Sequence, residues 1–188
     1  MLAYVFWHWR RGDVPPDRYE ELQRRFHAVL QAAGVPGFLG SRSAAMQGAA
    51  WAAGGRDAYE DWYLLEGSAA LDPLNDAAVS AARREPHDAA AAAAENGTAG
   101  LFRLRLGSPG DAPRTAVWFG KPAGMSYATL LEALAPFVRP AGSALWGRQM
   151  TLGPTPEFCL ESAQPVRLPP PFVGTVTPRR PIWPAPAS

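Results

Sequence analysis

The chain has 188 residues, which is long enough for one large domain with a sizeable core or for two small domains. Its composition is that of a globular protein, with 47% hydrophobic and 11% aromatic residues. The formal net charge of +1 gives no electrostatic reason to expect nucleic acid or an anionic membrane as a partner.

The single cysteine, Cys159, excludes an internal disulfide, and no cysteine or histidine spacing resembles a metal site. The N-terminus lacks the basic and apolar regions of a signal peptide. No stretch approaches the roughly 20 apolar residues that span a bilayer. We therefore expect a soluble cytoplasmic protein without a metal or cofactor.

The first part of the chain, residues 1–108, predicts the element order β-α-β-β-α-β, a ferredoxin-like unit. A helix with Asp17 as its N-cap and an apolar face including Tyr19, Leu22, Phe26 and Leu30 follows the first strand. The expected elements are strands at 2–10, 37–46, 58–67 and 101–107, a helix at 17–33, and a helix-rich span at 76–95 interrupted at Pro86. The sequence "NGTAG" at 96–100 predicts a turn before the last strand.

The second part, residues 109–163, predicts an abbreviated β-α-β-β copy of the same unit, packed on the first. The expected elements are strands at 115–122, 143–152 and 156–162 and a helix at 125–138 with Ser126 as its N-cap. Tyr19 and Leu22 of the first helix match Tyr127 and Leu130 of the second, which indicates an internal duplication.

The tail at 164–188 is too rich in proline for a helix or a central strand. It is expected to be an extended strap or a disordered end. Phe172, Val173, Ile182 and Trp183 favour a strap that packs on the rest of the protein.

Two stretches, "FWHWRRGDVPPDRYEEL" at 6–22 and "FGKPAGMSYATLLEAL" at 119–134, resemble the strand-loop-helix entry of the dimeric α/β-barrel superfamily, in its EthD-like and stress-response-barrel branches. The resemblance covers roughly residues 2–163. It implies an α+β fold in which two ferredoxin-like sheets surround a cavity, and it makes a homodimer possible. Members include cofactor-free oxygenases, lactone isomerases and haem enzymes. The haem branches use a histidine late in the chain, and here no histidine follows His87.

The alternation of side chains along two predicted strands indicates where a pocket would lie. Val5 and Trp7 lie on one face of the first strand, and His8 lies on the other. In the strand at 101–107 apolar and basic residues alternate. The face with the apolar side chains is expected to pack against the helices, which leaves the opposite face for a cavity. We expect this cavity to contain His8 as the acid/base group and Arg10, Arg42, Arg103 and Arg105 as ligand-binding groups, with Tyr4, Phe6 and Trp62 as walls. Guanidinium groups bind planar anions, so a small carboxylate or phenolate is the expected ligand.

Two alternatives remain open at this stage. The arginines could close ion pairs with Glu60, Asp61 or Glu66, or lie in an interface. His27 is expected to be an ordinary helix-surface or boundary residue. His87 is expected at a helix start next to Asp88, because no second ligand cluster accompanies this pair to support a metal or acid/base role. The leading functional hypothesis is a protein that binds a small organic molecule without a cofactor and, if it is an enzyme, acts as an oxygenase, isomerase or decarboxylase. The competing hypothesis is a non-enzymatic structural or protein-interaction module.

Overall fold

The computed structural model describes residues 1–52, 58–139 and 141–184. The first part contains β1 (Leu2–Arg10), α1 (Pro16–Gln31), β2 (Phe38–Met46), β3 (Ala58–Leu65), α2 (Leu71–Val79), α3 (Arg84–Ala93) and β4 (Ala94–Gly107). The second part contains β5 (Thr115–Phe119), α4 (Tyr127–Leu134), β6 (Ala144–Arg148), β7 (Phe158–Ser162) and β8 (Gly174–Trp183). The chain is therefore a mixed α+β protein.

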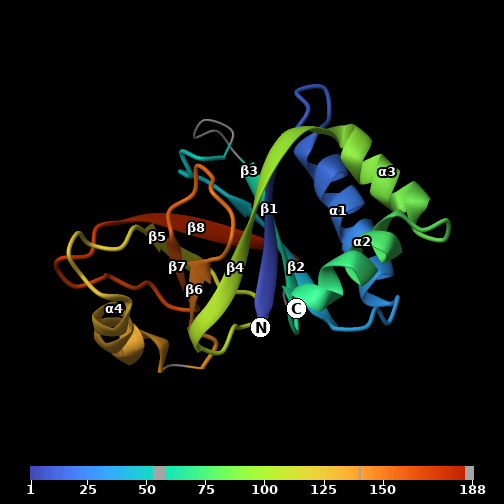
Figure 1. Cartoon of the computed structure of the whole chain (residues 1–188). Coiled ribbons are helices and arrows are strands. Elements are labelled where there is room, and N and C mark those ends of the chain that lie inside the picture. Colours follow the sequence, from blue (N-terminus) through green and yellow to red (C-terminus); the bar gives the residue numbers. More distant parts are fainter. Residues whose placement is uncertain (53–57, 140, 185–188) are drawn as a thin grey trace.

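The eight strands pair antiparallel in a closed barrel with the order β1-β3-β2-β8-β5-β7-β6-β4. The order contains two similar runs, β4-β1-β3-β2 and β8-β5-β7-β6. Helices α1, α2 and α3 lie together on one side of the barrel, and α4 lies at the other end of the molecule (Figure 1). The barrel closes within one chain. None of the helices in the described part of the chain is long and apolar enough to cross a membrane.

The proline-rich tail supplies a barrel strand, contrary to the expectation that prolines would keep it out of a sheet interior. Residues 174–178 of β8 pair with β5, whereas Arg179, Arg180, Pro181 and Trp183 pair with β2. Each part of β8 is therefore paired along one edge only. A proline lacks an N–H but interrupts just one ladder there, so Pro178 and Pro181 are tolerated.

The interior of the barrel is filled by aromatic side chains. Four fully buried tryptophans and a phenylalanine from five different strands pack together: Trp7, Trp62, Trp118, Trp146 and Phe102. The expectation that the sheets surround a ligand cavity is therefore wrong for the barrel interior of this chain. The closed barrel excludes water from its interior, and the largest apolar side chains therefore occupy it.

A buried ionic network joins β8 to the barrel interior. Arg42 Nη2 lies 2.5 Å from Glu161 Oε2, and Arg179 bridges Glu161, at 2.6 Å, and Glu60. Trp146 donates its indole N–H to Glu161 over 2.7 Å. Burial alone would raise the pKa of Glu161, but the two guanidinium groups outweigh this effect and lower it. Arg42 therefore closes an ion pair, as the alternative interpretation held, but with a different carboxylate.

Several element boundaries differ from the sequence expectation. The interruption between α2 and α3 lies at residues 80–83, and Pro86 stands in the first turn of α3, where its missing N–H costs no helical hydrogen bond. Helix α1 begins at Pro16, so Asp17 lies within its first turn rather than at the N-cap. Ser126 is confirmed as the N-cap of α4, because its hydroxyl accepts the backbone N–H of Thr129 over 3.1 Å.

The sequence at 96–100, expected to be a turn, belongs to the long strand β4 and pairs with β1. Gly97 has a packing role there. A Cβ atom at this position would lie 2.5 Å from the ring of Phe6. The glycine thus marks a close approach between two strands, which a sequence pattern does not distinguish from a turn.

Candidate functional site

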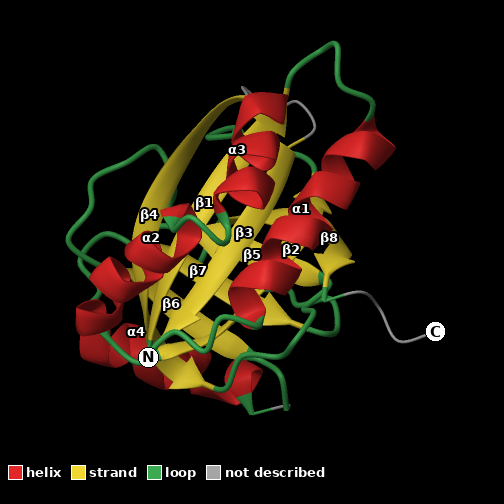
Figure 2. Ribbon diagram, turned by 90° about the vertical axis from the view of Figure 1, so that its right-hand side faces the viewer, coloured by secondary structure: helices red, strands yellow, loops and turns green. Residues whose placement is uncertain are grey.

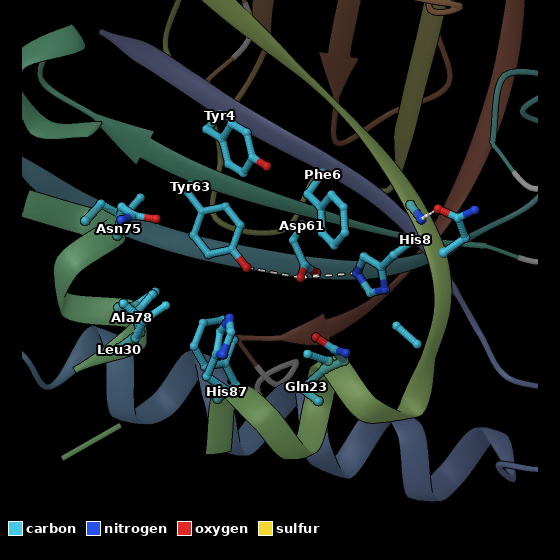
Figure 3. Close-up of a pocket in the computed structure, with 18 of the residues that line it drawn as sticks. Tyr4, Phe6, His8, Gln23, Leu30, Asp61, Tyr63, Asn75, Ala78 and His87 are labelled. Carbon is cyan, nitrogen blue, oxygen red and sulfur yellow. Dashed lines mark hydrogen bonds and ion pairs between the residues drawn. The ribbon is translucent and has the colours of Figure 1, made fainter. Parts of the chain in front are cut away.

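A cavity of about 750 Å³ lies outside the barrel wall, between β1 and β3 on one side and α1, α2 and α3 on the other. Figure 2 shows the three helices crossing this part of the sheet. Apolar and aromatic side chains make up most of the wall of this helix–sheet cavity, including Tyr4, Phe6, Phe26, Leu30, Leu71, Leu74 and Val79. The polar lining includes His8, Tyr19, Gln23, Asp61, Tyr63, Asn75 and His87, and Figure 3 shows most of these side chains.

The pairing register of β1 and β3 determines which side chains form the polar floor of the cavity. Tyr4 lies opposite Tyr63, and Phe6 lies opposite Asp61. Because directly opposed residues of antiparallel strands share a sheet face, these side chains and His8 all point away from the barrel interior. The sequence interpretation had expected the other face of this sheet to meet the helices. The structure reverses that assignment, since Trp7 and its apolar neighbours fill the barrel.

Asp61 is the centre of a buried polar cluster. Its Oδ2 atom lies 3.2 Å from His8 Nε2 and accepts the hydroxyl of Tyr63 over 3.3 Å (Figure 3). The same oxygen lies 3.2 Å from His27 Nε2. The residue is only 2% exposed. Burial alone would raise the pKa of Asp61, but the electrostatic influence of His27 and His8 prevails and lowers it. Asp61 is therefore an ionised carboxylate shared by two imidazoles.

His8 is held by polar contacts at both ring nitrogens and by two stacked aromatic rings. Its Nδ1 atom lies 2.6 Å from the hydroxyl of Tyr19, on α1, while Nε2 faces Asp61. Phe6 and Tyr59 stack against the ring, with centroids 5.0 and 5.8 Å away. Burial, and then the charge of Asp61, raise the pKa of Tyr19, so this phenol stays protonated. The imidazole therefore has a single, fixed orientation.

His27 contacts Asp61 but is not one of the residues that line the cavity. Its Nδ1 atom is 2.8 Å from the hydroxyl of Ser41, and its ring stacks on Tyr63 and on Trp183 of β8. The sequence interpretation took His27 for an ordinary helix position and missed this role. The helical pattern places His27 next to the apolar stripe, but only the docking of β8 encloses it completely.

The structure brings three of the eight predicted site residues into the cavity, namely Tyr4, Phe6 and His8. Trp62 and Arg42 lie inside the barrel, where the Arg42 guanidinium stacks on the Trp62 ring at 4.8 Å. Inward-facing residues of two strands share the barrel interior, so these two residues cannot reach the outer face.

The other three predicted arginines also lie elsewhere. Arg10 donates to the carbonyl of Val14, over 2.8 Å, where β1 ends. Arg103 is exposed and donates to Gln149. Arg105 is exposed, near Gly147 of β6. The guanidinium groups on which the anion-binding hypothesis depended are therefore dispersed.

The charges that line the cavity have an acidic balance. Within the described part of the chain, no arginine or lysine lines it, whereas Asp61 lies at the floor and Asp72 and Glu95 are exposed lining residues. The same part of the chain holds no group of three or more histidine, cysteine or carboxylate side chains placed to bind a metal ion. The polar side chains that line the cavity can donate and accept hydrogen bonds.

No family model and no curated protein sequence matches the chain. Among solved structures, a protein of Fusobacterium nucleatum subsp. nucleatum, provisionally named a monooxygenase, matches with a TM-score of 0.57 and 12% identity, over 85% of this chain and 73% of that chain. A Lactobacillus acidophilus protein with the same provisional name (TM-score 0.49, 12% identity, 86% and 77% covered) and an anthrone oxidase-like protein (0.44, 12%, 87% and 73%) are less similar. At 12% identity the Fusobacterium protein shows a shared fold alone, the ferredoxin-like α/β barrel.

Proposed function

We propose that this protein binds a small, mostly apolar organic molecule in the helix–sheet cavity and that His8 exchanges a proton with it. One observation carries the proposal: a cavity of about 750 Å³ is lined by the buried pair of His8 and Asp61. Cavities of roughly 300 to 1,000 Å³ with apolar walls and a few convergent polar groups are typical of small-molecule sites.

The ligand of this proposal is uncharged, which revises the anionic ligand expected from the sequence. A carboxylate would meet Asp61, Asp72 and Glu95 with no arginine or lysine to pair with among the described lining residues. Burying an unpaired charge is costly. The rings of Tyr4, Phe6 and Phe26 instead favour an aromatic body.

His8 has the surroundings of a general acid/base. The ionised carboxylate of Asp61 fixes the ring and would stabilise the imidazolium that forms on proton uptake. Proton removal makes an electron-rich aromatic or enolic molecule more reactive toward dioxygen or toward isomerisation. Decarboxylation, the third reaction class considered from the sequence, would need a carboxylate substrate and does not fit this lining. Oxygenation and isomerisation without a cofactor belong to the leading hypothesis drawn from the sequence, and they are the class to assay first.

Thermal-shift screening with neutral hydroxylated aromatic compounds tests the proposal. Ala78 is a half-buried lining residue of α2, so Ala78→Trp should fill part of the cavity and abolish ligand-induced shifts. Ala92→Trp is the matched control, because Ala92 is exposed on α3 and lies outside the lining. Shifts that persist in Ala78→Trp, or no shift in the wild-type protein, would overturn the proposal and favour the interaction module.

We also propose that the chain is a tandem of two ferredoxin-like units, with residues 109–163 as the second unit and the tail completing its sheet. The matching strand orders β4-β1-β3-β2 and β8-β5-β7-β6 support this organisation. Co-expression of residues 1–108 and 109–188 as separate chains should give a stable complex. Failure of the fragments to associate would count against two units.

A further inference from the structure

We infer that His27 carries the positive charge that pairs with Asp61, and that this charge keeps His8 neutral and therefore able to accept a proton. His27 is thus a positioning residue of the proposed site, because it acts on a ligand only through His8. The role of His8 in this inference rests on the proposed function, whereas the assignment of the charges needs no ligand.

The two imidazoles share a single carboxylate oxygen. Asp61 Oδ2 lies 3.2 Å from the Nε2 atom of His8 and 3.2 Å from the Nε2 atom of His27. Within the described residues neither Nε2 atom has a hydrogen-bond partner, so Asp61 acts on both rings through its charge. Two imidazolium ions beside one oxygen repel each other, and protonation of one ring therefore opposes protonation of the other.

Asp61 requires one positive partner. It is ionised and only 2% exposed, and a buried charge is costly unless an opposite charge lies beside it. No arginine or lysine in the described part of the chain forms an ion pair with it. Arg24 and Arg180 pair instead with Glu20, the buried carboxylate of α1. One of the two imidazoles is therefore the cation.

Tyr19 determines that this cation is not His8. Tyr19 is fully buried, and burial raises the pKa of its hydroxyl, which therefore keeps its proton. A buried hydroxyl needs an acceptor inside the protein, and His8 Nδ1 lies 2.6 Å from the Tyr19 oxygen. An imidazolium carries a hydrogen on both nitrogens, so a His8 ring that accepts this hydrogen bond is neutral.

The surroundings of His27 suit an imidazolium. Its Nδ1 atom lies 2.8 Å from the hydroxyl of Ser41, which can accept a hydrogen bond as well as donate one. The ring stacks on Tyr63 with centroids 5.5 Å apart, within the range of a cation–π contact. The other rings that face the two imidazoles carry no formal charge at neutral pH: Phe6 and Tyr59 beside His8, and Trp183 beside His27.

The charge on His27 has a consequence for proton exchange at His8. An imidazole beside an ionised carboxylate alone is favoured in its protonated form, which cannot act as a base. Because His27 already neutralises Asp61, His8 stays free to accept a proton at neutral pH. Once His8 is protonated, repulsion from His27 favours return of the proton, as a group that acts both as base and as acid requires.

Nitrogen NMR of the full-length, 15N-labelled protein at neutral pH tests this assignment, because protonated and unprotonated imidazole nitrogens have well-separated chemical shifts. The chain has three histidines, and ring contacts with Trp183 and with Phe6 identify His27 and His8. We expect both nitrogens of His27 to be protonated and His8 to be protonated at Nε2 only. A neutral His27 or a charged His8 in the wild-type spectrum would overturn the inference, whether or not any variant folds.

His27→Gln replaces the cation with a neutral amide that can still bond to Ser41, so the fraction of His8 in the imidazolium form should rise at least about tenfold. His27→Lys restores a cation and should leave His8 neutral, which a merely structural role of His27 would not explain. His87→Gln is the matched control, because it removes the partly exposed imidazole that pairs with Asp88 and should leave the other two histidines unchanged.

The outcomes separate this inference from the proposed function. An unchanged His8 in His27→Gln would overturn the inference and leave ligand binding untouched. Conversely, the predicted charges together with no ligand-induced thermal shift in the wild-type protein would overturn the proposed function alone.

Discussion

The two outer faces of the barrel differ in how they are filled. Under α4, the sheet that contains β5, β6 and β7 packs against an apolar cluster that includes Phe119, Leu130, Leu134, Phe158, Leu160 and Phe172. Under α1, α2 and α3, the sheet that contains β1 and β3 carries a cavity and a buried polar cluster of His8, His27, Asp61, Tyr19 and Tyr63.

This difference separates a face whose packing stabilises the fold from a face that carries the proposed ligand site. Apolar burial stabilises the tightly packed second face, and apolar contacts do not depend on direction as hydrogen bonds do. Buried polar groups contribute to stability only when each has a partner, and their geometry is demanding. A buried polar cluster beside a cavity leaves this face less completely packed and therefore less stable. This loss of stability is common at functional sites.

Phe119→Ala should have the largest effect, because Phe119 is 1% exposed and packs on Phe158 and Phe172. We expect a loss of about 3–5 kcal/mol in the free energy of unfolding. Urea denaturation measures it, and ligand-induced thermal shifts should persist in the fraction that folds. A loss below about 1 kcal/mol would contradict the description of the second face as the tightly packed one.

Enlarging a side chain should have opposite effects on the two faces. Leu130→Trp in the filled face should destabilise the protein by about 1–3 kcal/mol, because there is no space for the larger ring. Ala78→Leu should stabilise it by about 0.5–1 kcal/mol by filling part of the cavity, at the expense of ligand binding. Destabilisation by both variants, measured in urea, would mean that the faces are packed alike.

Acid should reveal the contribution of Asp61. Its pKa is lowered in the folded protein, so its stabilisation is complete above its ordinary pKa of about 3.9 and is lost as the pH falls toward the folded value. Asp61→Asn should therefore be less stable than the wild-type protein at neutral pH. The difference should shrink below about pH 4, by at most about 1.4 kcal/mol per pH unit. A difference independent of pH in urea titrations would show that Asp61 is not ionised.

Arg103→Ala should have the smallest effect. Arg103 is exposed and lies outside the cavity lining, with Gln149 as its hydrogen-bonded partner. The free energy of unfolding should change by less than about 0.5 kcal/mol, and ligand-induced thermal shifts should be unchanged. Loss of the shifts in this variant would restore the arginine-lined pocket expected from the sequence.

Local patterns predicted the elements well where the signal is periodic. The buried face of α1, with Tyr19, Leu22 and Leu30, follows from three- and four-residue spacing. The strands also appear near the predicted positions, because alternation and β-branched or aromatic content are local properties. Asn96–Gly100 was misassigned because glycine serves both turns and close strand contacts, and only the neighbouring Phe6 distinguishes them.

The predicted site was partly right for the same reason. Alternation correctly placed Tyr4, Phe6 and His8 on one face of β1, but it carries no information on which face meets the helices. The arginines were grouped by residue type, and their positions depend on which side of each strand faces the barrel. Asp61 and His27 were not recognised, because their contacts join β1, β3 and α1 over long sequence separations.

The sequence by itself determined the succession of strands and helices from β1 to β7, the period-two faces of the strands and the amphipathic face of α1, since these depend on residues close together in the chain. Only the tertiary structure decided that the barrel interior is filled, that the proline-rich tail supplies β8, and that the cavity lies under the helices. Closing the barrel removes one face of every strand from water, so the largest apolar side chains occupy the interior. The polar partners of His8 then have to be found outside the barrel wall, where α1 carries Tyr19 to the floor of the cavity.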